Sequence, residues 1–264
     1  MFRLVDGIRL NHVSFAYPGA DRLALDDVTL HLPAGAVVAI VGENGAGKST
    51  LVKLLAKMYE PTSGEILIDG EPLHRMRTED WRNRLTGAFQ DFFRFEFSAQ
   101  HSVGLGDLPR LDDESAVDEA VARAGARDVV ERLPEGLHSQ LGPTWPGGQE
   151  LSFGQWQKLA LSRGYMRSDS LLIMLDEPTA SLDAETEHEL FERYAQAAHV
   201  DESASSRSGE ITILVSHRFS TVRMADLIVV LDGSRLAGVG SHEQLMQRDG
   251  PYADLYRIQE AAYQ

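Results

Sequence analysis

The stretch Val37-Val-Ala-Ile-Val-Gly42-Glu-Asn-Gly-Ala-Gly47-Lys48-Ser-Thr50 decides the fold. Five apolar residues predict a buried strand, and the glycines that follow predict a tight loop. After the loop, apolar residues recur at helical spacing at Leu51, Leu54, Leu55 and Met58. A strand, a glycine-rich loop and a helix in this order satisfy the P-loop pattern G-x-x-x-x-G-K-S, which predicts an α/β fold with a phosphate-binding site.

The chemistry of the loop follows from its residue types. Its backbone N–H groups can turn inward around phosphate oxygens, and the helix that begins near Lys48 adds the positive end of its dipole. Lys48 supplies a charge for the β- and γ-phosphates of ATP, and the Ser49 hydroxyl is suited to Mg²⁺. A glycine-rich turn beside a chance lysine is the alternative, but lysine occurs at only four positions in the chain. The predicted nucleotide-binding residues here are Gly42, Asn44, Gly45, Ala46, Gly47, Lys48, Ser49 and Thr50.

A second apolar run, residues 171–175, ends in the carboxylates of Asp176 and Glu177. A carboxylate at the tip of a strand can hold Mg²⁺ and its water, which suits Asp176. Glu177 can then accept a proton from the attacking water. Taken alone, such a run is more often an ordinary strand end. Beside a P-loop, it predicts the second half of a nucleotide site.

Working outward, alternating apolar residues place Val13, Phe15 and Tyr17 on one face of a strand, and Val28, Leu30 and Leu32 on one face of another. These strands predict an antiparallel sheet edge. Further strands are expected at 65–68, 85–89, 171–175, 211–215 and 227–231, several apolar on both faces as in a covered parallel sheet. Helical signals, including 112–124, fill the interval from 91 to 167. We therefore expect one domain, with a mixed-sheet core of residues 1–90 and 168–264 and a helical subdomain at 91–167.

Composition excludes several classes of protein. The chain of 264 residues has a net charge of −15, which argues against a nucleic-acid partner. It has no cysteine, so disulfides, thiolate zinc sites and a cysteine nucleophile are excluded. The longest apolar runs are far shorter than the roughly 20 residues of a membrane span, and no signal core opens the sequence.

Downstream, Leu151-Ser-Phe-Gly-Gln155 and the Trp156-Gln-Lys-Leu-Ala-Leu-Ser-Arg163 that follows resemble the signature segment of ATP-binding cassette (ABC) nucleotide-binding domains. We call residues 151–155 the signature segment. The resemblance runs from about residue 8 to about residue 250. In order, its elements are Tyr17, the P-loop, Gln90, the signature segment, Asp176-Glu177-Pro178-Thr179, Ser181-Leu182-Asp183 and His217.

The resemblance implies a P-loop core with an antiparallel β subdomain and a helical insertion. It also implies that two such domains meet head to tail, each signature segment closing over ATP on the other P-loop. It assigns nucleotide contacts to Ser152, Gly154 and Gln155. By the same resemblance Tyr17 stacks on adenine, Gln90 reaches the metal and water, Asp183 contacts the opposing subunit and His217 bonds the γ-phosphate.

Each of the last four residues has a plainer reading when taken alone. Tyr17 is then a packed strand residue, Gln90 a solvated strand end, His217 a histidine with its hydrogen bonds satisfied, and Asp183 a helix N-cap. Their order along the chain favours the functional reading.

The chain departs from the family pattern in two places. Phe153 stands where the family usually has glycine, and it would be strained if its φ were positive. The segment before the signature is Gly142-Pro-Thr-Trp-Pro-Gly-Gly-Gln149 instead of the acidic loop usual in exporters. Because Ser152 and Gly154 are present, we expect a working signature.

The resemblance implies an ATPase that drives transport across a membrane, most similar to the exporter branch, with ATP and Mg²⁺ as cofactors. Its expected partners are a second nucleotide-binding domain, identical or different, and a membrane domain that is fused upstream or separate, with fusion favoured. The expected location is the cytoplasmic face of the cell membrane. The alternatives are a soluble ABC ATPase of DNA repair, chromosome organisation or translation, and a module that senses ATP without hydrolysis, which Glu177 disfavours.

Overall fold

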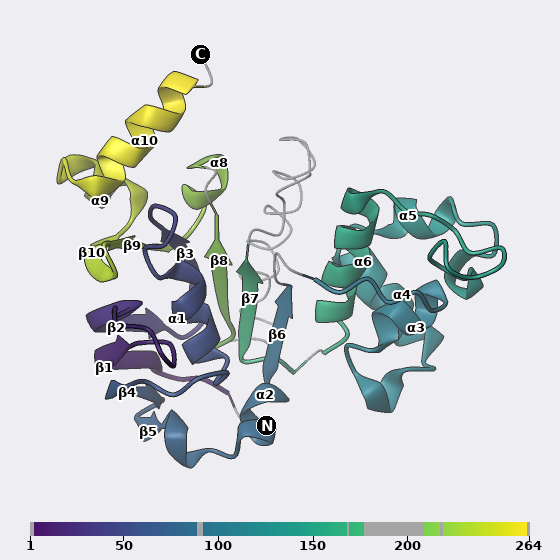
Figure 1. Cartoon of the computed structure of the whole chain (residues 1–264), viewed down its shortest axis with the longest axis horizontal. Helices are drawn as coiled ribbons and strands as arrows, with labels where there is room; N and C mark the ends of the chain where they lie inside the picture. Colours follow the sequence, from purple (N-terminus) through teal and green to yellow (C-terminus); the bar gives the residue numbers. More distant parts are fainter. Residues whose placement is uncertain (1–2, 89–91, 168, 177–208, 217–218, 263–264) are drawn as a thin grey trace. The chain divides into compact units, whose positions relative to one another are not determined.

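The computed structural model of the chain describes residues 3–88, 92–167, 169–176, 209–216 and 219–262 (Figure 1). The chain divides into two compact units. One contains the chain up to Leu85 together with the later strands and the C-terminal helices, and the other contains Thr86–Asp169. The P-loop belongs to the first unit and the signature segment to the second, so each is described within its own unit.

An antiparallel sheet opens the first unit, with the strand order β2-β1-β4-β5. Its strands are β1 (Gly7–Phe15), β2 (Leu25–Pro33), β4 (Ser63–Ile68) and β5 (Glu71–Pro72). Val28, Leu30 and Leu32 alternate with more exposed residues along β2, as the sequence predicts. The prediction for Tyr17 is wrong in one respect, because β1 ends at Phe15 and its register shifts near that end, so Tyr17 does not continue the strand face.

The start of the described chain is fastened to this sheet by the carboxylate of Asp69. The backbone N–H groups of Val5, Asp6 and Gly7 donate to its oxygens over distances of 2.8 to 3.1 Å. The N–H of Asp69 donates in return to the carbonyl oxygen of Gly7 at 2.9 Å. Successive N–H groups around one anion form a nest, here filled by a side chain of the protein itself.

A second sheet carries the centre of the first unit, with the strand order β10-β9-β3-β8-β7-β6. Strands β3, β8, β7 and β9 run parallel, and β10 pairs antiparallel with β9. Every residue of β3, β7 and β8 is buried, as a covered parallel sheet requires. The strands are β3 (Val37–Val41), β6 (Leu85–Ala88), β7 (Leu172–Asp176), β8 (Ile211–Val215), β9 (Leu227–Asp232) and β10 (Arg235–Gly240).

Short helices follow these strands in the first unit. Helix α1 (Lys48–Leu55) comes after β3, and η1 (Leu73–Arg75) and α2 (Thr78–Arg82) precede β6. Helices α8 (Phe219–Val222), α9 (His242–Gln247) and α10 (Pro251–Ala262) lie in the C-terminal part (Figure 1).

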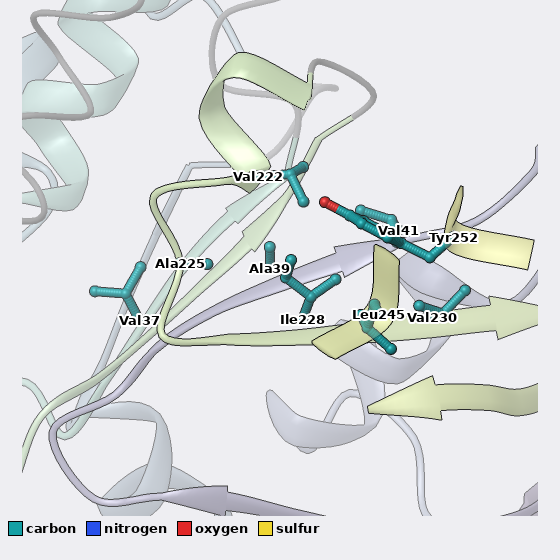
Figure 2. Packing of buried hydrophobic residues seen from close by; sticks show 9 residues of the cluster. All are labelled: Val37, Ala39, Val41, Val222, Ala225, Ile228, Val230, Leu245 and Tyr252. Carbon is teal, nitrogen blue, oxygen red and sulfur yellow. The ribbon is translucent and has the colours of Figure 1, made fainter. Parts of the chain in front are cut away.

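A cluster of buried residues joins the C-terminal helices to the sheet (Figure 2). Leu245 of α9 and Tyr252 of α10 pack with Ala39 of β3 and Ile228 of β9. Each fully buried side chain of this size contributes about 1.5–3 kcal/mol relative to an exposed one. The remaining members are Val37, Val41, Val222, Ala225 and Val230. The cluster therefore anchors β3, the strand that leads into the P-loop, from the helical side.

Apart from Thr86–Ala88, which belong to strand β6, the second unit is mainly helical within the residues described. Its elements are α3 (Ala99–Gly104), η2 (Leu108–Arg110), α4 (Glu114–Arg123), α5 (Arg127–Glu131), η3 (Gly136–His138) and α6 (Phe153–Gly164). The helix predicted at 112–124 is α4, whose N-cap Asp113 accepts a hydrogen bond from the N–H of Ala116. Helices α3 and α4 pack against α6, the helix that the signature segment begins.

Across the described residues of both units, no helix has the length and apolarity needed to span a bilayer.

Candidate nucleotide-binding site

Glycine is required by geometry at two positions of the P-loop. Gly42 has φ 149°, and a Cβ added there would lie 2.1 Å from the carbonyl oxygen of Leu231. Gly47 has φ 102°, and a Cβ there would lie 2.5 Å from the carbonyl oxygen of Ala24. A side chain at either position would force the backbone apart as well as strain its own conformation. The two glycines therefore set the path of the loop against neighbouring backbone.

The side chain of Lys48 folds back across the loop. Its Nζ donates to the carbonyl oxygens of Gly42 at 2.8 Å and Glu43 at 2.9 Å. The N–H of Ala46 also donates to the Glu43 carbonyl, so this short segment closes on itself. The lysine is buried, which strengthens the field of its charge at the mouth of the loop. This placement fits the predicted contact with phosphate.

Helix α1 begins without a side-chain cap among the described residues. Gly47 is its N-cap, and no acidic residue lies in its first turn. The first N–H groups of a helix have no partner within the helix, and the helix dipole places partial positive charge there. An anion such as a phosphate can satisfy both, as in other phosphate sites at helix N-termini.

The strand register brings Asp176 to the same sheet edge as the P-loop. Ile40 of β3 pairs with Val215 of β8, and Val215 pairs with Asp176 of β7. All three strands run parallel, so their carboxyl ends meet at one edge, where open α/β sheets bind ligands. With neighbouring strands about 4.8 Å apart, β3 and β7 lie roughly 10 Å from each other. The phosphate loop and this carboxylate are therefore two strands apart, with β8 between them.

Ser49 and Asp176 offer the kind of ligands that Mg²⁺ prefers. Ser49 lies exposed in the first turn of α1, and Asp176 is only 8% exposed at the end of β7. Hydroxyl and carboxylate oxygens are hard donors, and Mg²⁺ usually takes few protein ligands beside water and nucleotide phosphates. No cluster of three or more histidines or carboxylates that could hold a metal is found among the described residues. The donor set therefore fits the ion.

Tyr17 lies beside α1 in an aromatic group. Its hydroxyl and that of Thr50 share a hydrogen bond at 3.1 Å. Its ring meets those of Phe15 and Tyr59 at centroid distances of 5.0 and 5.3 Å, and Nζ of Lys53 lies 5.8 Å from its centroid. The sequence reasoning did not single out Tyr59 or Lys53. The sequence does point to Lys53, because it lies one helical turn after Thr50 and is one of only four lysines.

The signature segment begins α6 with a capping box. The Ser152 hydroxyl accepts from the N–H of Gln155 at 3.3 Å, and the Ser152 N–H donates to Oε1 of Gln155 at 2.8 Å. Phe153 is the first residue of the helix and is not among the residues with positive φ, so the strain considered for it does not arise. Gly154 follows in the first turn. Ser152, Gly154 and Gln155 are thus brought together as the sequence predicts.

Four predicted residues, Gln90, Glu177, Asp183 and His217, lie outside the described residues. Within the first unit the structure brings together the P-loop, Tyr17 and the edge that carries Asp176. The signature residues form their own group in the second unit. The roles of all these residues in binding or hydrolysing a nucleotide stay predictions.

Comparison with known proteins identifies the family. The family model described as ABC transporter matches residues 25–180, which is more than half of the chain. This chain belongs to the ABC transporter family. It is 39% identical over 254 residues to the ATP-dependent lipid A-core flippase of Ralstonia nicotianae, a match that covers 96% of this chain and 40% of the flippase. The flippase of Cupriavidus metallidurans is 41% identical over 253 residues with the same coverage.

A solved structure gives the same answer for the fold. A bacterial Atm1-family ABC exporter with ATP bound is similar to this ABC domain with a TM-score of 0.85 and 34% identity. The match covers 97% of this chain and 42% of the exporter chain. The expectation of an ABC nucleotide-binding domain of exporter type is therefore confirmed. The chain spans about 40% of the length of the relatives it matches.

Proposed function

We propose that this ABC domain binds Mg-ATP at the P-loop and hydrolyses it to drive export across a membrane. The observation that carries the proposal is the sheet edge where the P-loop with buried Lys48, the N-terminus of α1 and the buried carboxylate of Asp176 lie within two strands of each other. Family relatives named as exporters favour transport over the alternative of a soluble ABC ATPase.

Binding begins with the polyphosphate of ATP. Backbone N–H groups of the loop and the first turn of α1 hold the phosphate oxygens, and Lys48 pairs with the β- and γ-phosphates. Tyr17 stacks on the adenine. Ser49, Asp176 and Gln90 would hold Mg²⁺, which would supply positive charge against the negative charge that develops on the phosphates.

Hydrolysis then needs a base and an oriented water. The oxygen of water attacks the γ-phosphorus, and Glu177 accepts its proton while the bond from the γ-phosphorus to the β–γ bridging oxygen breaks. The products are ADP and inorganic phosphate. Gln90 orients the water, and His217 donates a hydrogen bond to the γ-phosphate.

A second nucleotide-binding domain completes the site in this proposal. Its Ser152, Gly154 and Gln155 close over the γ-phosphate, and its Asp183 lies at the contact between the two domains. ATP thereby joins the domains, and hydrolysis releases them. Because the chain spans about 40% of its relatives, we assign the remainder of the transporter to a membrane domain, with this domain at its cytoplasmic face. Relatives named as lipid A-core flippases make lipid A-core the first cargo to test.

The decisive test is Glu177→Gln. The variant keeps the shape and polarity of the side chain but cannot accept the proton, so turnover should fall by about a hundredfold or more while Mg-ATP binding persists. The trapped ATP should favour a dimer, which light scattering at high protein concentration with and without ATP would detect. Unchanged turnover would remove Glu177 as the base.

A further inference from the structure

The segment 92–97, Phe-Phe-Arg-Phe-Glu-Phe, is the richest in aromatic residues in the chain. The proposed nucleotide site gives it no role. We call it the aromatic segment. It lies in the second unit and holds the signature helix α6 at both ends, as well as the loop that leads into the signature. Each of these contacts joins residues that are far apart in the sequence.

At the start of α6, Phe153 is the point of contact. Its ring lies 5.3 Å from that of Phe92, and the guanidinium of Arg94 lies 5.4 Å from its centroid. Phe153 remains 46% exposed, so the ring is an attachment at the surface and not part of the core. A tilted aromatic pair and a cation over a ring each add stability beyond the area they bury. A glycine, which the family usually has at this position, would make neither contact.

Near the end of α6, Arg163 makes the second attachment. Its Nη1 donates to the carbonyl oxygen of Phe93 at 3.2 Å, and its guanidinium lies 4.5 Å from the ring centroid of Phe95. Its Nε donates to the carbonyl oxygen of Ser102 at 2.7 Å, so the same side chain also binds α3. Burial lowers the pKa of the Arg163 guanidinium to about 10, so it is still charged at pH 7.

The contacts of Arg163 also come with a loss of stability. No ion pair to it is found among the described residues, and its Nη2 is buried there without a hydrogen-bond partner. A buried donor left unpaired destabilises a protein by about 1–3 kcal/mol. A leucine at this position would fill space without that penalty, which indicates that the directed contacts to Phe93, Phe95 and Ser102 are what this position provides.

The loop before the signature is fastened to the same segment by Glu96. Its carboxylate accepts from both the hydroxyl and the N–H of Thr144, and its carbonyl oxygen accepts from Nε2 of Gln140 at 2.9 Å. Leu141 donates to the carbonyl oxygen of Phe97 at 2.9 Å. The loop itself has no acidic residue from 142 to 149, so Glu96 brings a carboxylate to it from elsewhere in the chain.

We propose that the aromatic segment is a positioning element for the signature segment, and that Phe153 and Arg163 are positioning residues that fix α6 to it. The start of α6 is then presented at a set angle to the nucleotide on a second copy of the chain. The inference rests on the proposed function, because it needs ATP-dependent pairing of two domains. It predicts that this chain needs an aromatic ring at position 153, where a glycine would weaken pairing.

The test measures dimer formation in the Glu177→Gln background. Phe153→Ala removes the ring, and its dissociation constant for the ATP-bound dimer, from sedimentation velocity at saturating Mg-ATP, should be roughly tenfold higher. Phe153→Gly should weaken pairing at least as much, since glycine also loosens the first turn. Phe153→Tyr keeps a ring and should restore the parent value. Arg94→Gln should fall between the parent and Phe153→Ala.

Two further measurements separate positioning from a loss of stability. Mg-ATP affinity of the monomeric variants, measured by calorimetry, should match the parent, because the P-loop lies in the other unit. Leu108→Ala removes another exposed apolar side chain, 66% exposed in η2 of the same unit, and should leave pairing unchanged.

The outcomes separate the two proposals. If Glu177→Gln itself forms no ATP-dependent dimer, the proposed function fails and this inference falls with it. If the parent dimerises and Phe153→Ala pairs equally well, the inference alone is overturned. The same holds if Phe153→Ala weakens pairing only in step with a lower folded fraction, as judged by its melting temperature.

Discussion

Helix α1 has Gly47 as its N-cap and no side-chain cap among the described residues, whereas helix α6 is closed at its start by reciprocal hydrogen bonds between Ser152 and Gln155. Both starts carry the positive end of a helix dipole, and both are expected to meet phosphate. At the first, no side-chain cap is found among the described residues, and phosphate oxygens can accept from its N–H groups. The second satisfies two N–H groups within the chain itself.

One protein can therefore have a strong phosphate contact at α1 and a conditional one at α6. A γ-phosphate that reaches α6 competes with the capping box or uses the N–H groups the box leaves, and its net gain is smaller. We therefore expect a single domain to bind ATP through the P-loop alone. The signature should engage only when a second domain brings a nucleotide to it.

The largest effect is expected from Lys48→Ala, which changes the phosphate contact at the start of α1. Removing the ammonium deletes charge-assisted hydrogen bonds to two phosphates, so Mg-ATP affinity should fall by about a hundredfold or more. Isothermal calorimetry on the monomer measures it. Lys158→Ala is the matched control, since Lys158 is a lysine of α6 that pairs with Asp128 at 2.9 Å. Retained affinity in Lys48→Ala would refute the phosphate role.

The next largest effect should come from Ser152→Asp. Aspartate caps a helix as well as serine does, so the melting temperature should stay the same or rise. The added negative charge would face the γ-phosphate of the partner nucleotide, and the ATP-dependent dimer of the Glu177→Gln background should weaken about a hundredfold. An intact dimer in this variant would show that Ser152 does not approach phosphate.

The smallest effect is expected from removing the serine of a capping box. A second capping box in the molecule provides the control. Ser241 and Gln244 close α9 with the same reciprocal hydrogen bonds as Ser152 and Gln155. Ser152→Ala and Ser241→Ala should each lower the free energy of unfolding by about 1 kcal/mol, measured by urea titration. Only Ser152→Ala should also weaken the ATP-dependent dimer, by severalfold. Equal dimer loss in both variants would mean that capping, and not phosphate contact, explains the effect.

Local patterns in the sequence predict most of the site. The P-loop lies between β3 and α1 as expected, and Asp176 lies at the end of a buried strand. These features depend on residue types a few positions apart, because apolar runs, glycines and polar ends carry the information within one element. The capping box at Ser152 follows the same logic.

Features that depend on distant pairing could not be predicted in this way. The sequence predicts a strand at 65–68 but not its partner, and β4 pairs antiparallel with β1 in the four-stranded sheet. Strand β10 was not foreseen, since its burial is uneven and its partner β9 supplies the hydrogen bonds. The contact of Phe153 with Phe92 crosses 61 positions and leaves no trace in either local pattern. Choice of partner is a property of the whole chain.

The carboxylate of Asp69, which gathers the N–H groups of Val5, Asp6 and Gly7, also has a mechanical meaning. A pull on the chain before Val5 would first load several hydrogen bonds to the Asp69 side chain, in parallel. The force would then pass into β1, which is paired with β2 on one side and β4 on the other. Force applied there shears the interior of a sheet and does not peel an edge strand away. Tension on this end would therefore be transmitted to the domain before the domain unravels.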